Sequence, residues 1–176
     1  PNIKEMYSDA EWDKFRQEDG HIYWINVFQN SYGEDKTTTH NDEAFWIQCK
    51  VLEWAGYPQI NTLDEYFQLL EDYTAANPTM EDGTAYIPYT MLCDDWRYFC
   101  IENAGQFLDG YPNDGSVIVD TDNMKIVDYN TTDTTRRYLQ KLNEEYQKGM
   151  IDTEFATQIY DEYISCLLYT SPSPRD

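Results

Sequence analysis

The stretch NTLDEYFQLLEDYTAANP, from Asn61 to Pro78, carries the strongest structural signal in the chain. Thr62 is followed three residues later by Glu65, which is the spacing of a capping box at the start of a helix. Pro78 supplies a stop signal at the other end. The apolar residues between these ends recur at helical spacing and predict one buried helix face: Leu63, Tyr66, Phe67, Leu70 and Tyr73.

The residues before this helix predict a second helix, over 44–55, joined to it by a turn. Phe45, Cys49 and Leu52 share one helical face, and Gly56 supplies the stop signal. The segment 44–78 therefore predicts two consecutive helices with apolar faces.

Other elements are predicted on both sides of this pair. Ser8 with Glu11 forms another capping box, for a helix that Gly20 ends. The residues HIYWINVF, 21–28, are typical of a strand buried on both faces, and 29–43 is a polar loop. Further along, we expect a strand over 84–91 interrupted at Pro88, a helix over 94–108, a hairpin over 116–129, a helix over 132–148 and a last helix capped by Asp152.

Acidic residues dominate the charge of the chain. Its 33 Asp and Glu against 12 Lys and Arg give a net charge of −21, which opposes binding to nucleic acid or anionic lipid because both need Lys and Arg to displace counterions. The apolar (41%) and aromatic (16%) contents are too high for a disordered chain. No run reaches the apolar length of a membrane span. We therefore expect a folded protein that binds no nucleic acid.

Motifs that would identify catalytic or cofactor chemistry are missing from the sequence. It contains no GxSxG, HExxH, P-loop or GxGxxG pattern and no CxxC pair. The two histidines, His21 and His40, are expected to be solvated or structural. An EF-hand loop requires glycine at its sixth position and glutamate at its twelfth, whereas the window from Asp120 has Lys125 and Thr131 there. We expect no catalytic residue, no metal and no cofactor.

Aromatic side chains are the most abundant candidate binding groups. The chain has 16 Tyr and 5 Trp, and rings beside carboxylates suit sugars, whose C–H faces stack on rings while their hydroxyls form hydrogen bonds. Most of these rings lie on apolar helix stripes and are expected in the core. Trp96 differs, because it opens a helix directly after a strand and follows Asp94 and Asp95, where open α/β sheets bind ligands. At least one of the two aspartates is expected to cap that helix or oppose its dipole.

The order of four segments resembles a known protein family. GHIYWI begins at Gly20, the two-helix segment spans 44–78, Trp96 marks a strand-to-helix junction, and YLQKLNEEYQKGMIDTEF begins at Tyr138. In this order they are similar to the family 1 extracellular solute-binding proteins of bacterial ABC transporters, above all to large lipoprotein receptors for oligosaccharides. The resemblance extends from Pro1 to about Ser165.

The resemblance implies a fold, a function and a location. The fold would be α/β, in the two-lobed type II arrangement of periplasmic binding proteins, and this chain would be a helix-rich interior fragment of it. Residues 1–28 would end the first lobe and include the first hinge strand, and residues 29–165 would form part of the second lobe. The receptor would capture a carbohydrate between its lobes and deliver it to the permease subunits of an ABC transporter. It would be extracellular, on the cell surface, held by a lipid anchor that this sequence lacks. The fragment alone would bind sugar poorly or not at all, because half of the cleft is missing.

The same resemblance implies a ligand wall and no enzyme activity. Two alternatives remain open. One is a glycosidase fragment that uses Asp94 and Asp95 as its carboxylates, although adjacent residues do not face one another across a substrate. The other is a surface interaction module whose aromatic residues only form a core. The expected ligand-binding residues are Asp94, Asp95, Trp96 and Tyr98, with Asn26 and Gln29 near the hinge as weaker candidates.

The last residues, CLLYTSPSPRD from Cys166 to Asp176, differ from the rest of the chain. A disordered terminus or a linker would suit their two Ser-Pro pairs. The stretch also matches, codon for residue, the translation of a transposon-end sequencing adapter. We therefore interpret 166–176 as an artefactual tail, and we expect Leu167, Leu168 and Tyr169 to be loosely packed.

Overall fold

The computed structural model describes residues 2–25, 30–31, 34–35, 44–80, 82–111 and 117–170. The chain divides into two units, Pro1–Asp42 and Glu43–Asp176. Over these described residues each unit combines helices with one antiparallel sheet of two short strands, so the chain is α/β in the general sense.

The described residues of the first unit form two short helices and one pair of two-residue strands. The predicted capping box is confirmed, because the Ser8 hydroxyl accepts from the Glu11 amide and the Glu11 carboxylate accepts from the Ser8 amide. The helix ends at Phe15 instead of Gly20, whose positive φ of 82° belongs to a turn closed on the Gln17 carbonyl. The elements are α1 (Asn2–Met6), α2 (Asp9–Phe15), β1 (Asn30–Ser31) and β2 (Glu34–Asp35).

The strand predicted over 21–28 is wrong for residues 21–25, which form no strand. Tyr23 and Trp24 are 71% and 56% exposed, and Trp24 instead packs edge-to-face on Phe15. A buried strand needs neighbouring strands that supply hydrogen bonds, and no strand among the described residues pairs with this segment. Residues 26–28 lie outside the described residues, as does most of the loop predicted over 29–43. The part of that loop that is described forms the paired strands β1 and β2.

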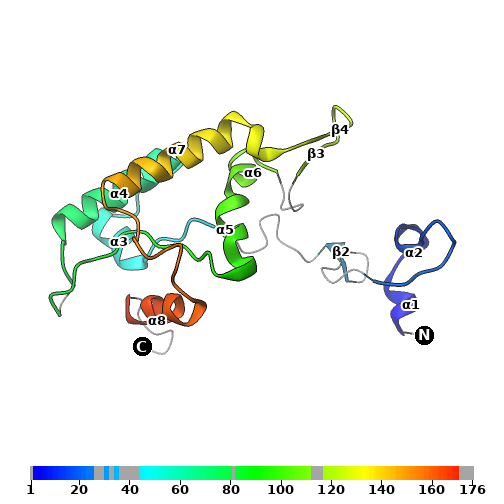
Figure 1. Ribbon diagram of the computed structural model, residues 1–176, viewed down its shortest axis with the longest axis horizontal. Helices are drawn as coiled ribbons and strands as arrows, with labels where there is room; N and C mark the ends of the chain where they lie inside the picture. The colour runs from blue at the N-terminus through cyan, green and yellow to red at the C-terminus, as the bar shows by residue number, and fades with distance from the viewer. Residues whose placement is uncertain are drawn as a thin grey trace. The chain divides into compact units, whose positions relative to one another are not determined.

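The second unit holds most of the secondary structure. Its helices pack with α4 and α7 side by side (Figure 1). The elements are α3 (Cys49–Ala55), α4 (Leu63–Ala76), η1 (Asp95–Tyr98), α5 (Phe99–Glu102), α6 (Ala104–Leu108), β3 (Ile118–Asp120), β4 (Lys125–Val127), η2 (Tyr129–Thr131), α7 (Asp133–Gln147) and α8 (Tyr160–Thr170).

Helix α4 matches its prediction in cap, face and end. The Thr62 hydroxyl accepts from the Glu65 amide at 3.2 Å, and the Glu65 carboxylate accepts from the Thr62 amide at 3.1 Å. The predicted apolar face is buried or partly buried, and Leu69 joins it. This face meets α7, whose residues Tyr138 and Leu142 are buried as expected.

Helix α3 was predicted to begin at residue 44, but it begins five residues later, at Cys49. The cause is a residue of the next helix. The Tyr66 hydroxyl donates to the Trp46 carbonyl at 2.9 Å, and a helix over 44–55 would use that carbonyl for its own backbone bond. The predicted end is confirmed, with Gly56 in the left-handed region at φ 73°.

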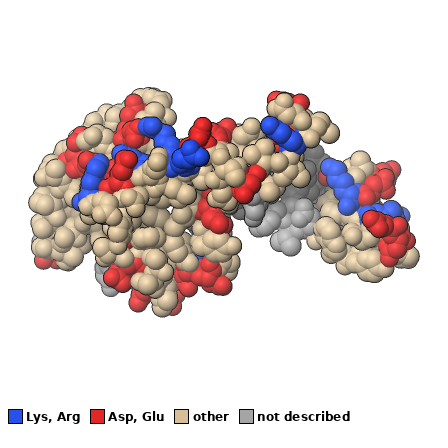
Figure 2. All heavy atoms as spheres, turned by 45° about the horizontal axis from the view of Figure 1, so that its top comes forward, with Lys and Arg blue, Asp and Glu red and all other residues tan. Residues whose placement is uncertain are grey.

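Charged side chains also join α4 to α7. Lys141 lies 3.5 Å from Asp64, and Lys148 lies 2.7 Å from Glu71. Arg137 pairs with Asp64 as well. Figure 2 shows basic side chains lying next to acidic ones on this part of the surface. The few Lys and Arg residues of the unit therefore form ion pairs largely with carboxylates of the same unit.

The strand predicted over 84–91 is replaced by an extended segment with two isolated bridges. Pro88 explains the interruption, because proline has no amide to donate to a neighbouring strand. Tyr89 makes a single parallel bridge with Ile151: its amide donates to the Met150 carbonyl at 3.1 Å, and its carbonyl accepts from the Asp152 amide at 2.9 Å. The predicted hairpin is confirmed as β3 paired with β4.

The last predicted helix begins later than expected. Asp152 accepts from the Glu154 amide at 2.9 Å within a turn and from the Thr90 hydroxyl at 3.0 Å, so it ties that turn to the extended segment instead of capping a helix. Helix α8 starts at Tyr160 and runs into the interpreted tail, where the side chains of 166–170 lie outside the described residues. The expected loose packing of that tail therefore stays a prediction.

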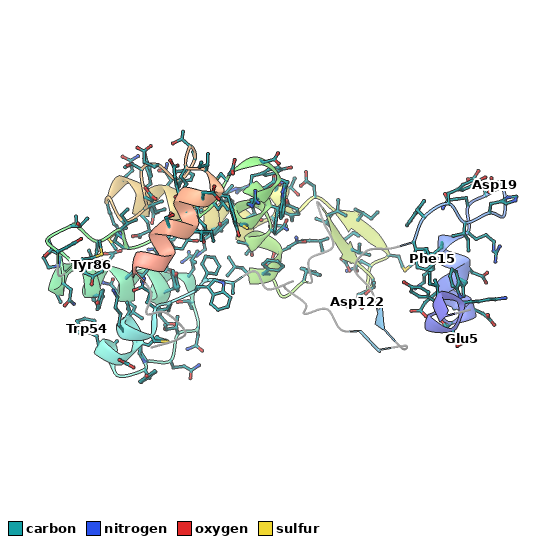
Figure 3. All side chains as sticks on the ribbon, turned by 90° about the horizontal axis from the view of Figure 1, so that it is seen from below. Glu5, Phe15, Asp19, Trp54, Tyr86 and Asp122 are labelled. Carbon is teal, nitrogen blue, oxygen red and sulfur yellow. The ribbon has the colours of Figure 1, made fainter. Side chains whose placement is uncertain are left out.

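A row of aromatic rings joins α3 to the segment after α4. Trp54 meets Tyr73 edge-to-face at 5.4 Å, and Tyr73 meets Tyr86 at 5.8 Å. Figure 3 labels Trp54 and Tyr86 at the same end of the unit. Lys50 donates to the Tyr86 hydroxyl at 3.2 Å and lies over its ring. These rings pack on one another, but Trp54 is still 48% exposed. Among the described Tyr and Trp residues only Tyr66, Tyr129 and Tyr138 are buried, so the prediction that most of these rings lie in the core is wrong.

Gly105 sits where α6 touches α7, and this contact leaves no room for a side chain. A Cβ atom at residue 105 would overlap Thr135 Oγ1 and lie 3.0 Å from Thr135 Cβ. We expect Gly105→Ala to lower the free energy of unfolding by about 1–3 kcal/mol through overpacking, as measured by urea denaturation. In a Thr135→Ala background, Gly105→Ala should lower the free energy of unfolding by less, because the Thr135 hydroxyl is gone. An equal loss in the two backgrounds would contradict a close contact between residues 105 and 135.

Candidate functional site

The candidate site lies at the junction between the extended segment that follows α4 and the short helices that follow it. A continuous helix was predicted over 94–108, but the structure contains η1, α5 and α6 in its place. Asp95 contributes to the irregular start, because its φ of 53° lies in the left-handed region that a right-handed helix cannot use. The junction consequently turns sharply at residues 94–96.

Asp94 does not use its side chain as the predicted N-cap. It holds the N-cap position of η1 without a capping hydrogen bond. Its Oδ2 instead accepts from the Tyr160 amide at 3.0 Å, at the first residue of α8, and lies 3.9 Å from Arg97 Nη1. This carboxylate therefore connects the junction to α8, a partner that is distant in sequence.

Trp96 presents most of its ring to solvent. It is 59% exposed and stacks nearly parallel on Phe99, with ring centroids 5.5 Å apart and 9° between the planes. Tyr98 is 52% exposed, and Asp95, the residue that precedes Trp96, is exposed as well. One short stretch of chain thus presents an exposed indole that stacks on Phe99 and the exposed carboxylate of Asp95.

Arg97 is a member of the site that the sequence-based prediction missed. Its guanidinium carbon lies 4.8 Å from the centre of the Trp96 ring and 4.3 Å from the centre of the Tyr160 ring. Cation–π contacts of this length are attractive, and more so where the cation is partly shielded from water. The Arg97 side chain is 25% exposed. A basic residue beside Trp96 is visible in the sequence, but its contact with Tyr160 depends on the tertiary fold.

Four of the six predicted site residues lie within five consecutive residues at the start of η1, so their proximity follows from the sequence itself: Asp94, Asp95, Trp96 and Tyr98. Asn26 and Gln29 lie outside the described residues. In the described part of the chain, no group of three or more His, Cys, Asp or Glu side chains is arranged to hold a metal ion.

The chemistry available at this site is that of binding a polar molecule with an apolar face. An exposed indole can stack on the C–H face of a saturated ring. Carboxylate and guanidinium groups within a few residues of it can accept from and donate to hydroxyl groups. The site thus combines an apolar platform with both kinds of charged hydrogen-bonding group.

Comparison with known proteins gave no match to the chain among family models, curated proteins or solved structures. Over the residues that the structure covers, no helix combines the length and apolar character needed to span a bilayer.

Proposed function

We propose that the chain is part of an extracellular solute-binding receptor that captures a carbohydrate, in particular an oligosaccharide, and delivers it to an ABC transporter. One observation carries the proposal: Trp96 is largely exposed, stacks on Phe99, and lies next to the guanidinium of Arg97, which is itself close to the Asp94 carboxylate. Proteins bind sugars by this pairing of ring stacking with charged hydrogen bonds. The order of sequence segments described above supports the same function.

In the proposed receptor, residues 29–165 form part of the second lobe of a two-lobed type II fold, and residues 1–28 end the first. The parallel bridge between Tyr89 and Ile151 supports this arrangement, because parallel pairing across a long helical connection is characteristic of α/β lobes. The receptor's partners would be permease subunits, and its location the outer cell surface through a lipid anchor. With a net charge of −21, it would not bind nucleic acid.

We propose binding without catalysis at this site. A glycosidase needs two carboxylates placed on either side of a glycosidic bond, whereas Asp94 is engaged with the Tyr160 amide and lies near Arg97. That engagement favours a holding role for Asp94. Assays of aryl glycoside hydrolysis by the wild type, Asp94→Asn and Asp95→Asn address the alternative, and hydrolysis that either substitution abolishes would favour the enzyme.

Removing the Trp96 ring should weaken sugar binding. We expect the wild type to give saturation-transfer NMR signals on the C–H protons of a neutral oligosaccharide, because this method detects weak contacts to an exposed ring. Trp96→Ala should lower the affinity about tenfold or more, which corresponds to ~1.4 kcal/mol, because the stacking platform is lost.

Trp46→Ala is the matched control for this experiment. Trp46 belongs to the same unit and is more exposed, at 77% against 59% for Trp96, so its removal deletes an indole outside the junction that is at least as accessible. Equal losses for the two variants would contradict a site at Trp96, and unchanged binding by Trp96→Ala would favour the surface interaction module.

A further inference from the structure

The Arg97 side chain has hydrogen-bond donors that the described residues leave unused. A guanidinium carries five N–H donors, and no hydrogen bond joins the Arg97 side chain to any part of the chain that the structure covers. The Asp94 Oδ2 atom is 3.9 Å from Nη1, which is beyond hydrogen-bond distance. The donors are therefore available, although the group is only 25% exposed.

Two aromatic rings hold this group without consuming its donors. The rings of Trp96 and Tyr160 lie 4.8 Å and 4.3 Å from the guanidinium carbon. Neither ring offers an oxygen or nitrogen acceptor to the guanidinium at these contacts, so its N–H donors make no conventional hydrogen bond there. Tyr160 is in turn bound through its amide to Asp94 at 3.0 Å. Arg97 is thus pre-positioned, which lowers the entropy cost of using it in binding.

We propose that Arg97 is a direct ligand-binding residue, which donates paired hydrogen bonds to two adjacent hydroxyl oxygens of a neutral sugar stacked on Trp96. This assignment rests on the proposed function. The planar fork of Arg97 matches two oxygens at a fixed spacing, which a vicinal diol supplies.

The charges around Arg97 favour a neutral sugar over an acidic one. Four carboxylates belong to the junction or to the first turn of α8 that contacts it: Asp94, Asp95, Asp161 and Glu162. One guanidinium among four carboxylates leaves the neighbourhood negative, and the whole chain carries −21. A sugar carboxylate would bind Arg97 at the cost of repulsion from these groups, whereas hydroxyls bind it without that cost.

The assignment is tested by saturation-transfer NMR and calorimetry with defined probes. The neutral probes are maltotriose, cellotriose and xylotriose, and the acidic probe is trigalacturonate. For each neutral probe that the wild type binds, analogues that lack single hydroxyls are added. The variants are Arg97→Ala and Arg97→Lys, with Arg136→Ala as a control that removes the same charge from an exposed arginine elsewhere in the unit.

We expect Arg97→Ala and Arg97→Lys to lower the affinity for a neutral probe about tenfold or more, because lysine keeps the charge but lacks the planar fork. Arg136→Ala should bind like the wild type. Removing one of the contacted hydroxyls should weaken binding to the wild type and leave binding to Arg97→Ala unchanged. If Arg97 only positioned Trp96, Arg97→Ala would weaken every analogue by the same factor, which would overturn the assignment.

The outcomes also separate this assignment from the proposed function. Binding by the wild type that Arg97→Ala and Arg97→Lys both retain overturns the role of Arg97 alone. Preference for trigalacturonate over all neutral probes overturns the neutral ligand. Absence of binding by every probe to the wild type overturns sugar binding at this junction, and with it both the site at Trp96 and the assignment of Arg97.

Discussion

Phe67→Ala is expected to lower the free energy of unfolding by about 4 kcal/mol, the usual cost of truncating a fully buried phenylalanine. Phe67 is 0% exposed. Its ring meets those of Tyr66 and Tyr89 edge-to-face, each with centroids 5.2 Å apart, and Lys141 lies over it at 5.7 Å. Removing the ring deletes these contacts and leaves a cavity between α4 and the extended segment, which urea denaturation followed by circular dichroism would measure.

Two further variants serve as controls for this prediction. Phe67→Leu keeps most of the volume and should cost about 1.5 kcal/mol or less, so it should stay folded if Phe67→Ala does not. Gln68→Ala changes the neighbouring exposed residue of the same helix and should stay within about 0.5 kcal/mol of the wild type. A similar small effect for Phe67→Ala would mean that this core is not closely packed.

Glu145→Ala is expected to cost about 3 kcal/mol, because it breaks a buried ion pair from one side. Glu145 is 0% exposed, and its Oε1 accepts from Lys141 Nζ at 2.8 Å and from Lys148 Nζ at 2.9 Å. The Lys141 side chain is only 13% exposed, so it would keep its charge in a largely buried place with Asp64 as its remaining partner. Glu144→Ala removes the adjacent exposed carboxylate and should change stability by about 0.5 kcal/mol or less.

The same carboxylate should make stability depend on pH. Burial alone would raise the pKa of Glu145, but hydrogen bonds from Lys141 and Lys148 outweigh it and hold the pKa below its ordinary value of 4.5. A carboxyl group whose pKa is lowered by folding stabilises the protein above its unfolded pKa and loses that contribution as the pH falls through its folded pKa. The difference in unfolding free energy between the wild type and Glu145→Gln should therefore narrow below about pH 4.5. A constant difference across that range would show that the charge of Glu145 does not stabilise the fold.

Helices with capping boxes were the most predictable part of the fold. The pairs Ser8 with Glu11 and Thr62 with Glu65 lie within one turn of chain, so the sequence contains both partners of each interaction. Helix α7 and Gly149 after it follow from equally local signals. Bounds were less accurate where a distant residue intervenes, as Tyr66 does at the start of α3.

Strands and the candidate site were predicted less well for the same physical reason. The residues from His21 to Ile25 have strand-like composition, but a strand exists only through its partner. At least one of Asp94 and Asp95 was expected to cap the helix or oppose its dipole, whereas Asp94 accepts a hydrogen bond from the amide of Tyr160, 66 residues away. Trp96 was identified from its neighbours in sequence, whereas Arg97 gains its importance from a ring contributed by α8.

The bridge between Tyr89 and Ile151 also bears on the order of folding. The adjacent hydrogen-bonded pair, Thr90 and Asp152, is separated by 62 residues in the chain. Closing a loop of this length lowers the conformational entropy of the chain before the contacts of the bridge can stabilise it. Helices α4 and α7, in contrast, form through local contacts. We expect the bridge to form after the folding transition state, so that weakening it accelerates unfolding and leaves the folding rate nearly unchanged.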